Sequence, residues 1–174
     1  MIVTVAAAAV LICLPFALAL AAVSDLFTMT IPNRVSVAVI ATFIILAPFS
    51  GMAWPAIGMS FVAASAVFAG CFALFAFNIM GGGDAKLLTA MALWFGYDQS
   101  LLQFLLAVSY AGGGVTILVL LIRTQAPTVM ALGIPVPPSL ATVSKIPYGI
   151  AIAIGGLFTI EHAPLYELAL RHFG

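Results

Sequence analysis

Long apolar runs separated by short polar breaks dominate the sequence. The runs are continuous and do not alternate between apolar and polar positions, so the pattern predicts α-helices and disfavours a β-barrel. A membrane-spanning helix needs about 20 mostly apolar residues. We therefore predict an all-α, polytopic membrane protein with about six transmembrane helices in a single integral-membrane domain, residues 1–174. The predicted spans are 2–25, 35–50, 56–78, 87–96, 101–122 and 146–160, of which 87–96 is the shortest.

The composition narrows the class of protein. Hydrophobic residues make up 65% of the chain and charged residues only 6%, five Lys or Arg against five Asp or Glu, for a formal net charge of zero. An ordinary soluble domain carries roughly 25% charged residues, so this composition excludes a soluble globular protein and a disordered chain. Nucleic-acid binding is not expected, because no basic surface can neutralise phosphates. In a membrane protein, each of these few charges lies at an interface or has a function.

The two cysteines, Cys13 and Cys71, each lie inside an apolar run. Their separation fits neither a metal-ligand spacing nor a disulfide framework, so we interpret them as packing residues and expect no metal site. The first apolar run is too long for a secretory signal and no Lys or Arg precedes it. We interpret it as a retained membrane helix.

The basic residues predict the orientation in the membrane. Arg34, Lys86, Arg123 and Lys145 lie in or beside the first, third and fifth connections, whereas Arg171 lies in the tail. The positive-inside rule places those three connections in the cytoplasm and both termini outside. The connection from Arg123 to Lys145 contains Pro residues and an apolar centre, and we expect it to lie in the membrane interface.

Two of the acidic residues differ from the others in their placement. Most charges at the non-cytoplasmic ends and in the tail fit solvated interface residues: Asp98, Glu161, Glu167 and Arg171. Asp25 and Asp84 instead both lie at the cytoplasmic ends of apolar spans, so the predicted topology places two carboxylates at a similar depth. A structural interpretation makes Asp84 the N-cap of the fourth helix and Asp25 a polar stop for the first. However, a carboxylate near a helix C-terminus meets the negative end of the helix dipole, which makes Asp25 a costly choice for a stop.

Three consecutive glycines, Gly81, Gly82 and Gly83, directly precede Asp84. Glycines at a helix start cost backbone entropy, but they permit unusual dihedral angles and close backbone approach. The structural interpretation is a flexible turn or a tight helix crossing. The functional one is a backbone opened so that an extended peptide can reach the carboxylate.

Asp25 and Asp84 have the chemistry of a catalytic pair. Two carboxylates about 3 Å apart share a proton, so that one acts as general base on a water and the other protonates the scissile carbonyl. From the expected helix ends, we predict that Asp84 at an N-terminus is the base and that Asp25 near a C-terminus holds the proton.

Three segments carry a resemblance to a known family. Gly81-Gly82-Gly83-Asp84-Ala85-Lys86 resembles the Gly-x-Gly-Asp motif of membrane aspartic peptidases, and its triple-glycine form with a following Lys is similar to type IV prepilin peptidase. The segment from Asp25 through Ile31-Pro32-Asn33 resembles the other catalytic segment of that family. Ile146-Pro147-Tyr148-Gly149 resembles its C-terminal Pro-aromatic-Gly stretch. The resemblance covers about residues 10 to 160.

The resemblance implies an aspartic endopeptidase of the bacterial inner membrane, without cofactor or metal, whose catalytic residues are Asp25 and Asp84. Its substrates are prepilins or pseudopilins, from which it removes a short basic leader at the cytoplasmic face, just before the apolar helix. We expect Lys86 to lie at lipid headgroups or to set topology, in preference to steadying Asp84. Other residues are candidates for binding substrate or shaping the site: Asn33, Arg34, Asn78, Pro147 and Tyr148.

The chain also departs from the larger family members. They carry an additional N-terminal segment, often with paired cysteines that bind zinc, and they methylate the new N-terminus. No Cys-x-x-Cys pair is present here, so we expect no methyltransferase activity. The chain resembles the short type associated with tight-adherence (Flp) pili, and the archaeal preflagellin peptidase is similar in chemistry. Two other functions stay open at this point: an ion- or proton-coupled transporter subunit that uses the same aspartates, and a structural membrane subunit.

Overall fold

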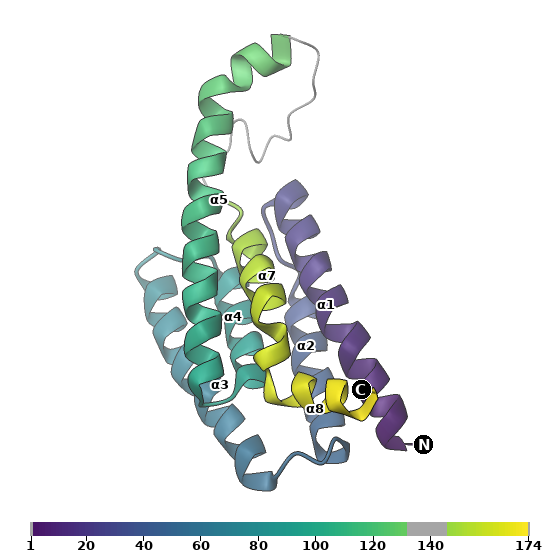
Figure 1. Ribbon diagram of the computed structural model, residues 1–174. Coiled ribbons are helices and arrows are strands. Elements are labelled where there is room, and N and C mark those ends of the chain that lie inside the picture. Colours follow the sequence, from purple (N-terminus) through teal and green to yellow (C-terminus); the bar gives the residue numbers. More distant parts are fainter. Residues whose placement is uncertain (1, 132–145, 174) are drawn as a thin grey trace.

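The computed structural model describes residues 2–131 and 146–173. Every regular element among them is helical, which confirms the all-α prediction (Figure 1). The α-helices are α1 (Ile2–Thr28), α2 (Asn33–Leu46), α3 (Trp54–Ala76), α4 (Gly82–Phe95), α5 (Gln99–Ala131), α7 (Tyr148–Thr159) and α8 (Pro164–Phe173). Short 3₁₀ helices follow α2 and α7, η1 (Ala47–Phe49) and η2 (Ile160–His162). Lys145 and most of the expected interfacial connection lie outside the described residues.

The apolar helices have the lengths of a membrane protein. Among the described residues, α1, α3 and α5 are long and apolar enough to cross a bilayer, and the pair formed by α7 with η2 and α8, bent by 56°, makes a fourth candidate. The predicted second and fourth spans correspond to α2 and α4, which have 14 residues each and are short for a bilayer core. The membrane class is therefore confirmed, and the count of six spans stays a prediction.

Helix α4 lies inside the helix bundle. From Leu87 to Phe95 every side chain except Thr89 is buried. Trp94 is fully buried and donates from its indole N–H to the Val39 carbonyl of α2, at 3.1 Å. The strong apolar character of this segment therefore reflects contact with other helices of the chain, and a buried helix does not need the length of a lipid-exposed span.

Small residues let α7 pack closely against its neighbours α1, α4 and α5 (Figure 1). A Cβ at Gly155 would lie 2.6 Å from the backbone nitrogen of Val108 in α5, so only glycine allows this crossing. A Cβ at Gly156 would meet Leu18 of α1 and Met91 of α4 at 3.0 and 3.2 Å. Close helix approach at small residues is a standard means of association in membranes.

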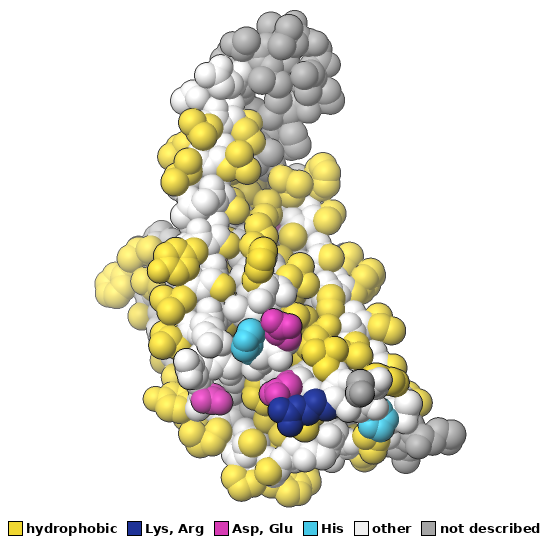
Figure 2. Space-filling model, viewed as in Figure 1, with side chains coloured by type: hydrophobic (Ala, Val, Ile, Leu, Met, Phe, Trp, Pro, Cys, Tyr) yellow, Lys and Arg dark blue, Asp and Glu magenta, His cyan; other side chains and the backbone are white. Residues whose placement is uncertain are grey.

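The expected polar tail is instead an amphipathic helix, α8. Its Leu165 and Ala169 are buried, whereas Arg171 is exposed and forms an ion pair with Glu167. Its ten residues are too few for the apolar periodicity to predict a helix. In Figure 2 the charged and His side chains of the visible face gather at the end where α8 lies, and the face above them is largely hydrophobic.

Asp25 and Asp84 lie toward the other end of the molecule. His172 of α8 contacts Thr4 near the start of α1, at 3.1 Å, whereas Asp25 is in the last turn of that helix. At 1.5 Å per residue, α1 separates Thr4 from Asp25 by about 30 Å. Asp84 is likewise at the opposite end of α4 from Asp98.

Candidate active site

Asp25 is a buried carboxylate with a partner from a distant part of the chain. Its side chain is 5% exposed and its Oδ2 accepts a hydrogen bond from the backbone N–H of Gly149, at 2.6 Å. Gly149 is the second residue of α7, whose N-cap, Pro147, supplies no side-chain bond. An N-cap residue normally accepts such an N–H within its own helix. Here Asp25 of α1 accepts it and so caps the start of α7. This placement differs from that of an exposed polar stop.

The chain around Asp25 is fixed by the end of α1. The Asp25 carbonyl accepts from the N–H of Met29, which has a left-handed φ of 54° and ends the helix. Beside it, two hydroxyls bond to backbone carbonyls: Ser24 donates to the Thr30 carbonyl at 2.8 Å and Thr28 to the Ser24 carbonyl at 2.8 Å. These bonds hold the last turn of α1 and the direction in which Asp25 points.

Asp84 lies in the first turn of α4 but is not its N-cap. The N-cap is Gly81, which has extended backbone angles and no side-chain cap bond. The N-cap interpretation of Asp84 is therefore wrong, because the helix begins two residues earlier than the carboxylate. A Cβ at Gly81 would lie 2.7 Å from Oδ2 of Asp84, so the carboxylate occupies the space over this glycine.

The triple glycine provides close approach and no unusual backbone. Among the described glycines only Gly51 and Gly96 have positive φ, so the expected unusual dihedral angles before Asp84 are absent. A Cβ at Gly82 would meet the Phe75 ring at 3.2 Å, and one at Gly83 would meet the Ile31 side chain at 3.3 Å. The glycines thus let the start of α4 pack directly on α3 and on the segment between α1 and α2.

Ile31 lies between the backbone segments that carry Asp84 and that bind Asp25. Its side chain is buried and meets the backbone of Gly83, one residue before Asp84. Its Cδ1 also lies 2.8 Å from where a Cβ at Gly149 would be, and Asp25 lies on the same side of that glycine, with Oδ2 at 2.9 Å and Cβ at 3.0 Å. The start of α4 and the start of α7 therefore pack on one side chain.

Tyr148 is the first residue of α7 and is half-buried. The Asp84 carboxylate is close enough to act electrostatically on its phenol group. The phenol lies over Gly112 of α5, where an added Cβ would be 2.7 Å from the hydroxyl and 2.8 Å from Cζ. Tyr148 and Gly149 thus connect the start of α7 to both aspartates.

Four other candidate residues named from the sequence lie on α2, on α4 and just after α3. Lys86 donates from Nζ to Oδ1 of Asn33 at 2.9 Å, and both side chains are exposed. Sequence reasoning named both residues but did not pair them. Asn78 has a left-handed φ of 58° just after α3, a conformation that Asn tolerates well, so it has a structural role there. Arg34 is exposed at the start of α2.

Sequence reasoning missed Gly112, Ile31 as a contact, and the Gly149 amide. One signal was present: Gly112, Gly113 and Gly114 form a second triple glycine inside an apolar run. The described residues contain no group of three His, Cys, Asp or Glu side chains that could hold a metal ion.

Comparisons with known proteins agree with the predicted family. The model of the type IV leader peptidase family matches residues 12–121, a segment that contains both Asp25 and Asp84. A search of curated proteins and a search of solved structures each gave no match. Because the family model covers more than half of the chain, the chain belongs to the type IV leader peptidase family.

Proposed function

We propose that the chain is a membrane aspartic endopeptidase that removes the short basic leader of prepilins or pseudopilins, with Asp25 and Asp84 as its catalytic pair. Family membership implies peptidase activity and favours this function over the transporter alternative. The observation that carries the assignment to these aspartates is their arrangement around the start of α7. Asp25 accepts the Gly149 N–H there, and the Ile31 side chain packs against both Gly149 and Gly83, the residue before Asp84.

The proposed reaction needs one ionised and one protonated carboxyl group. The ionised carboxylate removes a proton from a water molecule as its oxygen attacks the scissile carbonyl, and the protonated one donates to the carbonyl oxygen. A proton then passes to the leaving amine as the C–N bond breaks. Two adjacent carboxyl groups share a proton for electrostatic reasons and titrate as a unit.

Each proposed catalytic carboxyl group lies beside the first turn of a helix, Asp25 at α7 and Asp84 at α4. Asp25 is near the C-terminus of α1, but its Oδ2 also accepts an N–H from the first turn of α7. That bond favours the ionised form, as the start of α4 does for Asp84. The positions at helix ends therefore do not distinguish which aspartate is ionised. The role of Asp84 as base stays a prediction. The pH–rate profiles of Asp25→Glu and Asp84→Glu, compared with the parent, distinguish the two roles.

The basic charge of the leader supports a reaction at the cytoplasmic side of the membrane. A basic leader stays on the cytoplasmic side for the same reason that loop Lys and Arg residues do. The scissile bond between this leader and an apolar helix then lies at the membrane surface, the depth expected for carboxylates at the ends of spans. We accordingly place the site at the cytoplasmic face of the bacterial inner membrane.

Co-expression with a candidate prepilin tests the catalytic pair. Asp25→Asn and Asp84→Asn should each abolish leader removal while the protein stays in the membrane. Asp98→Asn and Glu161→Gln are matched controls, because both residues are exposed carboxylates away from the site, and cleavage should continue. Continued cleavage by either site variant would exclude the two-aspartate mechanism. The mass of the mature pilin tests the expected absence of methylation, because an added methyl group would contradict it.

A further inference from the structure

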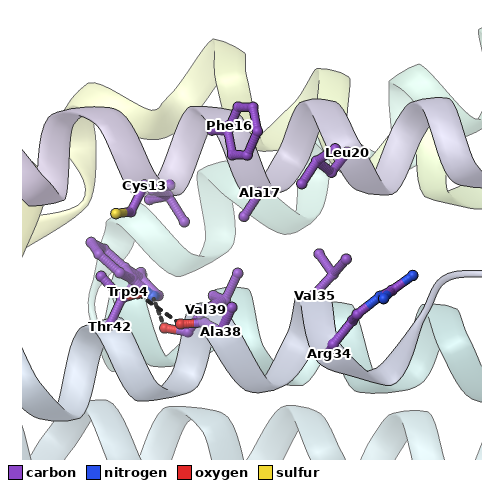
Figure 3. Close-up of a pocket in the computed structure, with 11 residues that line it drawn as sticks. Cys13, Phe16, Ala17, Leu20, Arg34, Val35, Ala38, Val39, Thr42 and Trp94 are labelled. Atoms are coloured by element: carbon purple, nitrogen blue, oxygen red, sulfur yellow. Dashed lines mark hydrogen bonds between the residues drawn. The ribbon is translucent and has the colours of Figure 1, made fainter.

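A groove of about 400 Å³ lies between α1 and α2, apart from the aspartates (Figure 3). Its walls are almost entirely apolar, and Trp94 of α4 closes one end. The residues that line it are Cys13, Leu14, Phe16, Ala17, Leu20, Arg34, Val35, Ala38, Val39, Thr42 and Trp94.

The groove opens to the outside of the helix bundle. Phe16 and Leu20 on α1 are 63% and 45% exposed, and Ala38 on α2 is exposed. Because α1 is a membrane-span candidate, its outer side meets lipid. The groove is therefore open on the side of the bundle that we expect to face lipid.

Arg34 gives the groove one charged end. In Figure 3 it lies at the opposite end from Cys13, Thr42 and Trp94. It is exposed and makes no hydrogen bond or ion pair with another described residue. Arg34 is the second residue of α2, close to the end of α1, so this end of the groove is at the membrane surface. A guanidinium at the membrane surface with no partner among the described residues is suited to a phosphate, with which it can form two parallel hydrogen bonds.

We infer that this groove binds one anionic phospholipid, with its phosphate on Arg34 and an acyl chain along the apolar walls toward Trp94. The volume of the groove favours a hydrocarbon chain over a protein helix as the bound group. An α-helix with its side chains is about 10–12 Å across, too wide for a hollow of this volume between two helices that contact each other. Neither the peptidase mechanism nor the orientation in the membrane is needed for this inference.

Native mass spectrometry of the purified protein in detergent tests the site. Phosphatidylglycerol and phosphatidylcholine with the same acyl chains are added separately, and bound lipid is counted. The parent should bind phosphatidylglycerol about fivefold more tightly, and Arg34→Gln should remove that preference, the effect of about one interfacial charge. Arg34→Lys should retain most of it.

A pair of variants on α2 locates the acyl chain. Ala38→Phe fills the groove and should reduce binding of both lipids. Val37→Phe is its matched control, because the adjacent Val37 is 61% exposed and does not line the groove. Equal binding of the two lipids by the parent, or binding unchanged in both Arg34→Gln and Ala38→Phe, would overturn the inference. Displacement of the lipid by an apolar helical peptide, or a dimer that Ala38→Phe breaks, would assign the groove to a protein and also overturn it.

Discussion

The second triple glycine offers a sharp test of how the site is built. Only Gly112 of the three contacts Tyr148: an added Cβ would lie 2.7, 2.8 and 2.9 Å from the hydroxyl, Cζ and Cε2 of the phenol. At Gly113 and Gly114 a Cβ would meet nothing within 4 Å. Gly112→Ala therefore forces the phenol to move, whereas Gly113→Ala and Gly114→Ala do not.

The expected magnitudes separate the three variants. Replacing Gly by Ala inside a helix stabilises a protein by about 0.5–1 kcal/mol, so the two control variants should be slightly more stable than the parent. Overpacking typically costs about 1–3 kcal/mol, so that after this gain Gly112→Ala should be about 0 to 2.5 kcal/mol less stable than the parent. Its larger effect should be on activity, because the contacting atoms are at the end of a side chain that can rotate away from Asp84. Displacement of a positioned group by about 1 Å can reduce a rate by on the order of 100-fold.

Two measurements on the same samples check this reasoning. Thermal unfolding in detergent reports stability, and leader removal from a candidate prepilin reports activity. Gly112→Ala should cleave at least tenfold more slowly, as a displaced group predicts, while Gly113→Ala and Gly114→Ala cleave like the parent. If all three variants show the same stability and the same activity, the placement of Tyr148 over Gly112 has no role in the site. Slower cleavage by all three would instead indicate a general need for flexibility in α5.

Three further predictions follow from single contacts. Gly149→Ala should lower leader removal by on the order of tenfold or more, because its Cβ would displace Asp25, and circular dichroism should show an intact helical fold. Lys86→Met should remove the hydrogen bond to Asn33 and lower stability by less than about 1 kcal/mol, as for exposed polar contacts, and a large loss in thermal unfolding would contradict this. Trp94→Phe should lower stability by about 1–3 kcal/mol without a specific effect on cleavage, since it leaves a buried carbonyl with one partner fewer.

The sequence located the helices and the two candidate catalytic residues for physical reasons that are local. Apolar runs predicted both ends of α1 and α3 and the start of α5 within a few residues, because a continuous run reports burial in lipid or protein directly. The end of α5 was predicted at residue 122, whereas the helix continues to Ala131 through a segment expected to be a connection. The scarcity of charge drew attention to Asp25 and Asp84, because a carboxylate in an apolar environment is costly unless it has a function. These inferences needed no knowledge of which segments meet.

The contacts that organise the site were beyond such reasoning. Asp25 and Gly149 are 124 residues apart in the sequence, and Lys86 and Asn33 are 53 apart. The spacing of apolar residues within one segment cannot predict a contact between two segments that are distant in the sequence. The same limit explains α4: its apolar run predicted a short membrane span, and the structure shows that other helices of the chain bury it. A run of apolar residues alone does not distinguish burial in lipid from burial in protein.

The position of Asp25 links the fold and the proposed chemistry in one bond. The first N–H groups of α7 need acceptors, and Pro147 supplies no side-chain cap. Asp25 provides one of these acceptors, so the helix that carries Tyr148 is fixed relative to α1 by the residue proposed to react. An Asn at this position can still accept the Gly149 N–H through its amide oxygen, but it cannot exchange a proton with water or substrate. Asp25→Asn is therefore the substitution that separates the two roles of this side chain, and a loss of cleavage with an unchanged fold would reflect its chemistry alone.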